Sequence, residues 1–226
     1  MDNRQLGLLL SAFFYTYAGM HLVVGYFLDR YNIRVVYGLF VGCWSLAQMA
    51  SGFSRGFWEL FTARLFLGTF EAAGQTGAAR IIARIVPAKD RSFANGIMMS
   101  GGSLGAVIAP VLVLGLSQSI GWRGAFVVLG LIGLGWAGAW FWWFRPGPEV
   151  LYGKAGEEKT DWGRILRKPQ FWACVGAAAF GVPIIHIASS WMPTFLVQQW
   201  KLTLGGDLSG SLFVIYLGLD AGFVGG

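Results

Sequence analysis

The chain has 226 residues, of which 55% are hydrophobic and 12% are charged, and its formal net charge is +6. Soluble domains contain about 25% charged residues, so this composition excludes an ordinary soluble domain and indicates a membrane protein. The basic residues stand mainly between long apolar runs, as membrane topology requires, and therefore do not indicate nucleic-acid binding. Cys43 and Cys174 both lie within apolar runs and are expected to be small core residues, not a disulfide or a metal site.

Long apolar runs predict an all-α fold, a multi-pass bundle of transmembrane helices. No cleavable signal peptide is expected, because the first five residues are polar and no small-residue cleavage pattern follows. A tight loop at 121–123 is expected between the fourth and fifth spans. The first five spans are expected at about 5–28, 35–53, 57–82, 93–116 and 125–144.

A hydrophilic linker follows the fifth span, and within it DWGRILRKPQF resembles a short amphipathic surface helix. After the linker, a sixth span is expected at about 172–197, and a last apolar run begins at Gly210. The expected domains are therefore 1–144, 145–169 and 170–226.

The stretch RLFLGTFEAAGQTGAAR, residues 64–80, places ionisable groups inside the third span. A charged group at mid-bilayer costs roughly 2.5–3.5 kcal/mol, so Arg64 and Glu71 are expected to face the interior of the bundle. At about 100° per residue, one polar stripe is formed by Arg64, Gly68, Glu71 and Gln75. Small residues between them would let another helix approach closely. We expect a functional site here; the alternative is an internal ion pair that only locks helix packing.

The first span carries Tyr17 and His21, which are four residues apart and so share one helix face. His21 is a candidate substrate-binding residue, and the alternative is a satisfied core or interface histidine. After this span, Asn32 lies in a short charged turn and is expected to tolerate a left-handed conformation.

The distribution of basic residues predicts the orientation in the membrane. Twelve of the 17 Lys and Arg residues lie in the segments 29–34, 80–91 and 145–169, against four in the alternate segments. Basic loops stay in the cytoplasm, so the chain is expected to start outside and to place its linker in the cytoplasm. The expected location is the inner (plasma) membrane.

The loop GYFLDRYNIR, residues 25–34, resembles the signature between helices 2 and 3 of the major facilitator superfamily. In that signature Gly is followed by three residues, Asp-Arg, and a Gly-Arg-Arg-like end, and this chain matches it at Gly25, Asp29, Arg30 and Arg34. Asn32 stands where Gly is usual. The resemblance implies a gate in which Asp29 contacts a neighbouring helix end or basic loop residue, with both arginines at the membrane surface.

Further stretches, RLFLGTFEAA, IVPAKDRSFANGI, GGSLGAVIAP and WRGAFVVLG, are similar to the anion:cation symporter branch of that superfamily, and within it to hexuronate-type transporters. The resemblance covers helices 2 to 8 of a twelve-helix plan. It implies that the chain is a fragment of a transporter that is monomeric at full length.

The resemblance also implies alternating access and proton-coupled symport of an organic anion such as a hexuronate. Arg64 matches an arginine of the substrate and ion-pair network, Glu71 an acid that carries the coupled proton, and Tyr17 a tyrosine near the substrate. Gln75 is a further candidate for substrate contact. Arg64 offers a planar fork to a carboxylate, and protonation of Glu71 would free it to bind the substrate. Helix 7 lacks the arginine and acid of hexuronate-like relatives, since 177–179 are alanines and Val182 precedes Pro183.

Two alternatives stay open. A same-fold exporter or antiporter would favour a longer Gly-Pro-Gly-Gly pattern where this chain has Ala109-Pro110-Val111. A non-transporting membrane protein, either a receptor on the transporter scaffold or an inert truncated product, is another. An enzyme is not expected, because no third catalytic partner or metal cluster accompanies 186–190. Neither a cofactor nor a metal site is expected.

Overall fold

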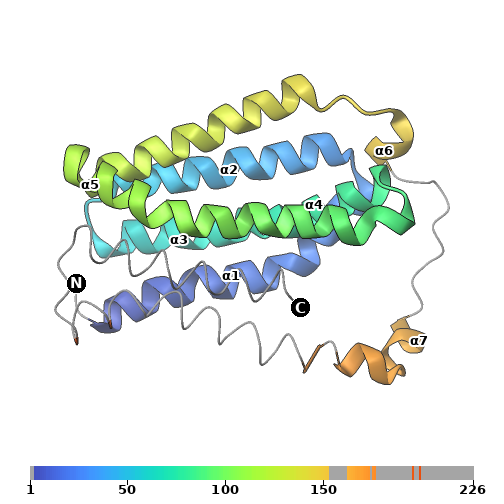
Figure 1. The fold of residues 1–226 in the computed structure, drawn as a ribbon. Coiled ribbons are helices and arrows are strands. Elements are labelled where there is room, and N and C mark those ends of the chain that lie inside the picture. The colour runs from blue at the N-terminus through green and yellow to red at the C-terminus, as the bar shows by residue number, and fades with distance from the viewer. Residues whose placement is uncertain (1–2, 153–161, 174, 177–194, 196–198, 200–226) are drawn as a thin grey trace. The chain divides into compact units, whose positions relative to one another are not determined.

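A computed structural model describes residues 3–152, 162–173, 175–176, 195 and 199. The described residues form helices and no strands, which confirms the all-α prediction (Figure 1). The elements are α1 Asn3–Arg30, α2 Ile33–Phe53, α3 Phe57–Glu71, α4 Ala73–Ile85, the 3₁₀ helix η1 Ala88–Asp90, α5 Arg91–Trp143, α6 Pro148–Tyr152 and α7 Trp162–Leu166.

The chain divides into two compact units. One unit comprises residues 1–105 and 112–155, and the other comprises 106–111 and 156–226. The first unit holds α1 to α4, α6 and most of α5, and it is the unit that carries every predicted site residue. The finer division at 144 and 169 stays a prediction. Helix α7 of the second unit confirms the helix expected in DWGRILRKPQF, whereas the spans expected at 172–197 and from Gly210 lie mostly outside the described residues.

The turn between α1 and α2 is short because Asn32 caps the second helix. Its side-chain oxygen accepts hydrogen bonds from the backbone N–H groups of Arg34 at 3.1 Å and Val35 at 3.4 Å. Such caps satisfy donors that have no partner within the helix. Asn32 has φ −57°, so it does not adopt the left-handed conformation that asparagine tolerates; it serves here as a helix cap.

The third span is interrupted, contrary to the single helix expected over 57–82. Helix α3 ends at Glu71 and α4 starts at Ala73, with Ala72 between them at φ −54° and ψ −24°. These angles are those of a 3₁₀ turn, so the chain tightens locally without leaving the helical region. With 15 and 13 residues, each half is too short to cross a bilayer of about 30 Å alone, but the two in succession are long enough.

The connection between the fourth and fifth spans confirms the tight loop expected there. The element α5 extends from Arg91 to Trp143, but it consists of two helices joined at a kink, where Gly121 has φ 75° and ψ 163°. Positive φ is open to glycine because it has no Cβ. This one residue therefore breaks the long element into two helices.

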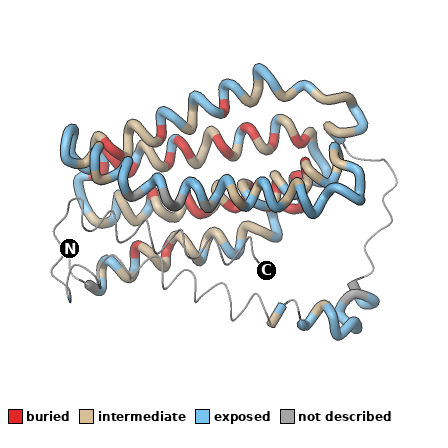
Figure 2. Tube along the Cα trace, viewed as in Figure 1, coloured by how far each residue is buried: buried red, intermediate tan, exposed pale blue. Residues whose placement is uncertain are grey.

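The core of the first unit lies where α1, α2 and α4 face one another, and Figure 2 shows buried positions concentrated along these helices. The core cluster consists of Val24, Leu28, Ile33, Val36, Ala72, Ala73 and Ile81. Gly68 of α3 lies directly against Phe13 and Thr16 of α1, where a Cβ atom would collide with backbone. The small residues of the third span thus permit the close helix approach expected of them.

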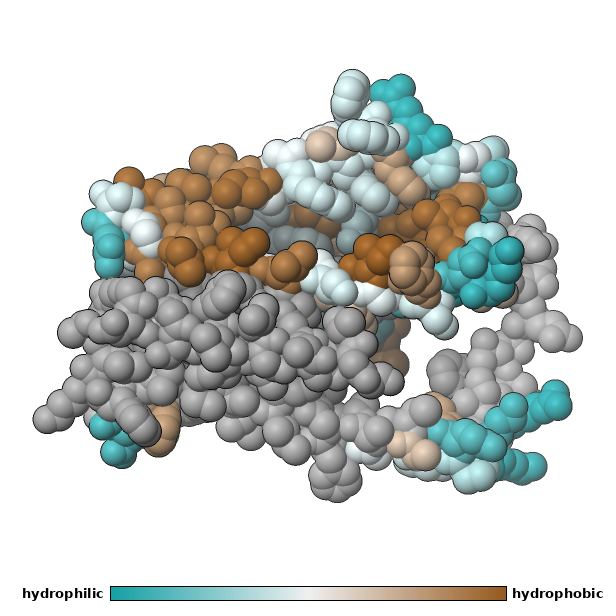
Figure 3. Space-filling model, in the orientation of Figure 1, coloured by the Kyte–Doolittle hydropathy of each residue, from teal (hydrophilic) through white to brown (hydrophobic). Residues whose placement is uncertain are grey.

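Three described helical segments have the length and apolar composition to cross a membrane: Arg4–Arg30, Ile33–Phe53 and Val111–Trp143. Large apolar side chains are exposed on them, among them Leu22, Leu39 and Leu131. Figure 3 shows apolar surface along the helices and hydrophilic residues toward the ends of the described bundle. Such a surface suits contact with lipid rather than water.

Candidate functional site

Arg64 and Glu71 both lie on α3, but they do not form the closed ion pair that one polar stripe suggests. The guanidinium carbon of Arg64 lies 5.2 Å from the centroid of the Phe126 ring on α5, over the ring face. No Glu71 oxygen lies within 4.0 Å of an Arg64 nitrogen among the described residues, although their charges are near enough to interact. The cation is therefore held by an aromatic face, with its N–H donors uncommitted within the described chain.

Tyr17 and His21 do lie together, as their spacing predicts. Their rings meet edge to face with centroids 4.5 Å apart. His21 Nδ1 forms a hydrogen bond of 2.7 Å with Thr76 Oγ1, which joins α1 to α4. Tyr17 is also close enough to Glu71 for its hydroxyl to feel the carboxylate charge. The Tyr17 hydroxyl therefore lies within electrostatic range of Glu71 at the end of α3.

Gln75 faces a different neighbour. Its side-chain amide lies 3.8 Å from the Met99 sulfur of α5, and both residues are exposed. Sulfur is a weak acceptor, so this contact leaves the amide largely free. Of the predicted stripe, the structure places Gly68 against α1, while Arg64 and Gln75 contact different parts of α5.

The signature residues lie at the other end of α1. Asp29 accepts two hydrogen bonds from one guanidinium, at 2.6 Å from Arg80 Nε and 2.9 Å from Arg80 Nη2. A Cβ atom on Gly25 would lie 3.2 Å from the same Nη2, so glycine leaves room for the arginine. Arg30 donates to the hydroxyl of Tyr26 at 2.9 Å and is exposed; its place at the membrane surface stays a prediction.

Arg34 makes its hydrogen bonds within the protein, and its place at the membrane surface stays a prediction. It is half-buried, and its Nη2 donates a short hydrogen bond to the backbone oxygen of Phe141 in α5. Trp140 Nε1 returns a hydrogen bond of 3.0 Å to the backbone oxygen of Arg34. The residue matching the end of the signature therefore fastens α2 to the second half of α5.

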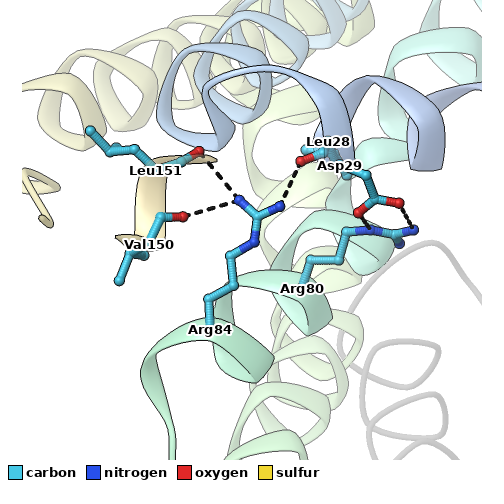
Figure 4. Close-up of polar contacts among 6 residues, drawn as sticks. All are labelled: Leu28, Asp29, Arg80, Arg84, Val150 and Leu151. Carbon is cyan, nitrogen blue, oxygen red and sulfur yellow. Dashed lines mark hydrogen bonds and ion pairs between the residues drawn. The ribbon is translucent and has the colours of Figure 1, made fainter. Parts of the chain in front are cut away.

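Arg84 was not singled out from the sequence, yet its guanidinium joins backbone oxygens of two helices (Figure 4). Its Nη1 donates to the backbone oxygens of Val150 at 3.0 Å and Leu151 at 3.3 Å, and its Nη2 donates to that of Leu28 at 3.0 Å. One cation thus holds the last turn of α1 and the end of α6, where carbonyl groups lack helical partners.

Arg80 and Arg84 are four residues apart, so both extend from one face of α4 toward the end of α1 (Figure 4). That spacing in RIIAR was a readable signal, but both arginines were counted only as basic loop residues. Thr76 was missed as well, because a threonine beside Gln75 gives no sign of its partner. Within the described ranges no three His, Cys, Asp or Glu residues gather at one point.

The comparisons with known proteins all identify similar transporters. A family model described as Major Facilitator Superfamily matches residues 1–226. "Probable sulfoacetate transporter SauU" of Cupriavidus necator is 30% identical, the match covering 100% of this chain and 55% of the relative. The hexuronate transporter of Escherichia coli K12 is 27% identical over 90% of this chain and 51% of the relative. The D-galactonate transporter of Escherichia coli O6:H1 is 31% identical over 90% of this chain and 53% of the relative.

A solved structure shares the fold. It is a bacterial homologue of the human lysosomal transporter Spinster in an inward-facing and unoccupied conformation, with a TM-score of 0.77 and 25% identity. The match covers 98% of this chain and 52% of that one, and the chain likewise spans about half the length of the first curated relatives. Because the family model matches every residue of the sequence, the chain belongs to the Major Facilitator Superfamily.

Proposed function

We propose that this chain forms part of a secondary active transporter that carries an organic anion across the plasma membrane together with a proton. The observation that carries the proposal is the state of Arg64: a guanidinium within the third span that rests on Phe126 and has no ion-pair partner among the described residues. An intramembrane cation is costly and usually marks a substrate or ion pathway.

The chemistry of Arg64 favours an acid as substrate. Its planar donors match the two oxygens of a carboxylate, and they match a sulfonate in a similar way. The similar proteins named above are a hexuronate, a D-galactonate and a sulfoacetate transporter by their printed names, and all three names are those of organic acids. A sugar acid is the substrate that we propose.

Glu71 is the proposed proton carrier. It ends α3 next to the 3₁₀ turn at Ala72, near enough to Arg64 and Tyr17 for charge interactions with both. The two side chains form no salt bridge among the described residues, so we propose that they are coupled through charge: a protonated Glu71 no longer offsets the positive charge of Arg64, and the guanidinium then attracts the anion more strongly. One proton and one anion are thereby linked to the same transition.

The signature residues at the C-terminal end of α1 supply the proposed gate. The Asp29–Arg80 pair and the contacts of Arg84 hold α1, α4 and α6 together at one end of the unit. In alternating access such contacts hold in one state and open in the other. The proposal therefore separates a binding site around Arg64 from a gate around Asp29.

The test is uptake by a full-length protein that carries this sequence, purified and reconstituted in liposomes. Galacturonate, galactonate and sulfoacetate would be supplied outside, with and without an inward proton gradient. Saturable uptake of at least one acid, driven by the gradient and abolished by a protonophore, is the expected result. Uptake that ignores the gradient would contradict proton coupling, and the absence of uptake or exchange of all three acids would contradict the proposed substrate class.

A further inference from the structure

His21 is a titratable residue within a membrane span, and its partner is a residue with no assigned role. The hydrogen bond between His21 Nδ1 and Thr76 Oγ1 is 2.7 Å long and crosses from α1 to α4. Both residues are half-buried. An imidazole in such a place needs its ring nitrogens matched to partners, because each nitrogen is either a donor or an acceptor.

The other threonines of these spans behave differently. Thr16, Thr62 and Thr69 each donate to a backbone oxygen of their own helix four residues earlier. Thr76 forms no such bond among the described residues, and the residue four positions before it is Ala72, where the helix is interrupted. The Thr76 hydroxyl is therefore available to another helix, and His21 takes it.

From this geometry we propose that Thr76 is a positioning residue for His21. Because the Thr76 hydroxyl donates to no backbone oxygen among the described residues, we assign it as the donor to Nδ1; this favours the tautomer with the proton on Nε2, fixes the orientation of the ring and leaves the Nε2–H group to donate to the substrate. Nε2 has no hydrogen-bond partner among the described residues. The assignment rests on the proposed function in one respect only, that the group meeting Nε2 belongs to the transported acid.

The surroundings of the ring support a site rather than a simple helix contact. Tyr17 packs its ring edge to face with His21, and the charge of Glu71 acts on the Tyr17 hydroxyl. His21 therefore packs against a tyrosine that lies within electrostatic range of Glu71, the proposed proton carrier. A ring held at Nδ1 is already oriented when the substrate binds. A ring without this hydrogen bond would exchange between two orientations, and ordering it would cost free energy each time a substrate binds.

The test can use the 226-residue chain itself, because it has only two histidines. The chain is labelled with ¹⁵N-histidine, placed in lipid nanodiscs and studied at a pH where the ring is neutral; His186→Gln assigns the signals. Nitrogen shifts separate the two neutral tautomers. The variants are Thr76→Val, which removes the hydroxyl at similar volume, and Thr76→Ser, which keeps it. Thr69→Val is the matched control, because its hydroxyl bonds only to its own helix.

We expect one dominant His21 tautomer in the parent chain and in Thr76→Ser, and a mixture of both in Thr76→Val. The control should leave the spectrum unchanged. An unaltered tautomer ratio in Thr76→Val, or an equal change in Thr69→Val, would overturn the positioning role. If Thr76→Val does not fold, Thr76→Ala provides the same comparison.

A second readout applies to a full-length protein carrying this sequence. Thr76→Val should raise KM severalfold with a smaller change in kcat, and Thr76→Ser should restore KM. A fall in kcat at unchanged KM would contradict a positioning role in binding. If no acid is transported at all, the proposed function fails, while the tautomer measurement still decides whether Thr76 positions His21.

Discussion

Asp29 and Arg80 form a two-point salt bridge between the end of α1 and α4, with oxygen–nitrogen distances of 2.6 and 2.9 Å. The two side chains remain 56% and 33% exposed. Exposed pairs contribute about 0–1 kcal/mol to stability, so this bridge defines a geometry without locking it. A contact of that strength can open and re-form at little cost, as a gate requires.

Asp29→Asn tests this role in a full-length protein carrying the sequence. The amide keeps the shape of the side chain but loses the charge, so we expect slower transport with little change in substrate affinity. The free energy of unfolding should change by no more than about 1 kcal/mol. Exchange rates in liposomes and equilibrium binding measure the two effects. Asp90→Asn, in η1, is the control for removing an exposed acid elsewhere in the unit, and unchanged turnover in Asp29→Asn would argue against a gate.

Arg84 should keep α6 attached to the first unit. Arg84→Gln removes the charge and the fork that reaches the Val150, Leu151 and Leu28 oxygens, so α6 should detach. A cysteine introduced at Leu151, in a background without native cysteines, should then react faster with a water-soluble thiol reagent.

Arg91→Gln is the matched control for that measurement. Its guanidinium also binds backbone oxygens, but those of Ala83 in the last turn of α4 and of Val86, the residue that follows α4. It should therefore leave labelling at position 151 unchanged. Equal labelling rates in the Arg84→Gln and parent proteins would show that α6 is held by other contacts.

The membrane orientation can be checked with single cysteines and an impermeant reagent in intact cells. Positions 90 and 160 should be protected, because the basic segments are expected in the cytoplasm. Positions 55 and 203 should react from outside. Labelling of position 160 in intact cells would contradict the predicted orientation.

Close packing at Gly68 predicts a difference between two glycines. Gly68→Ala forces a methyl group against the backbone of α1, and overpacking of this kind costs about 1–3 kcal/mol. Gly42→Ala is the control, because nothing lies within 4 Å of a Cβ placed there. Thermal unfolding in detergent should show a lower Tm for Gly68→Ala only. Equal Tm values would mean that α1 and α3 can move apart without loss.

The sequence predicted much of the fold because each apolar run is a strong and local signal. The tight connection at Gly121 was also predictable, since glycine marks a backbone that other residues avoid. The interruption at Ala72 was not, because alanine is the best helix former and gives no sign of a break. Helix α6 was missed, although Pro148 and Glu149 are typical of a helix start.

Only the ionisable residues of the candidate site could be predicted from the sequence. Arg64 and Glu71 stand out because charge inside a membrane span is rare. What they touch depends on other helices: the Phe126 face under Arg64 and the Thr76 partner of His21 come from distant positions. The contacts of Arg84 could not be read at all, since they go to backbone oxygens that every residue possesses.

Glu71 and Arg64 should fail in different ways when each is changed in a full-length protein carrying this sequence. Glu71→Gln resembles the permanently protonated form, so substrate should still bind and exchange across the membrane while uptake driven by a proton gradient is lost. Arg64→Lys replaces a planar fork with a point charge and should weaken binding about tenfold or more. Counterflow and gradient-driven uptake in liposomes measure the two losses.

A purely structural pair would give another pattern. If Arg64 and Glu71 only stabilised the bundle, both variants would show lower Tm and would lose binding and exchange together. The structure argues against this, because no salt bridge joins the two side chains among the described residues. Folding is therefore checked first, by Tm and by elution from a sizing column. A well-folded Glu71→Gln protein that still accumulates substrate against its gradient would eliminate Glu71 as the essential proton site.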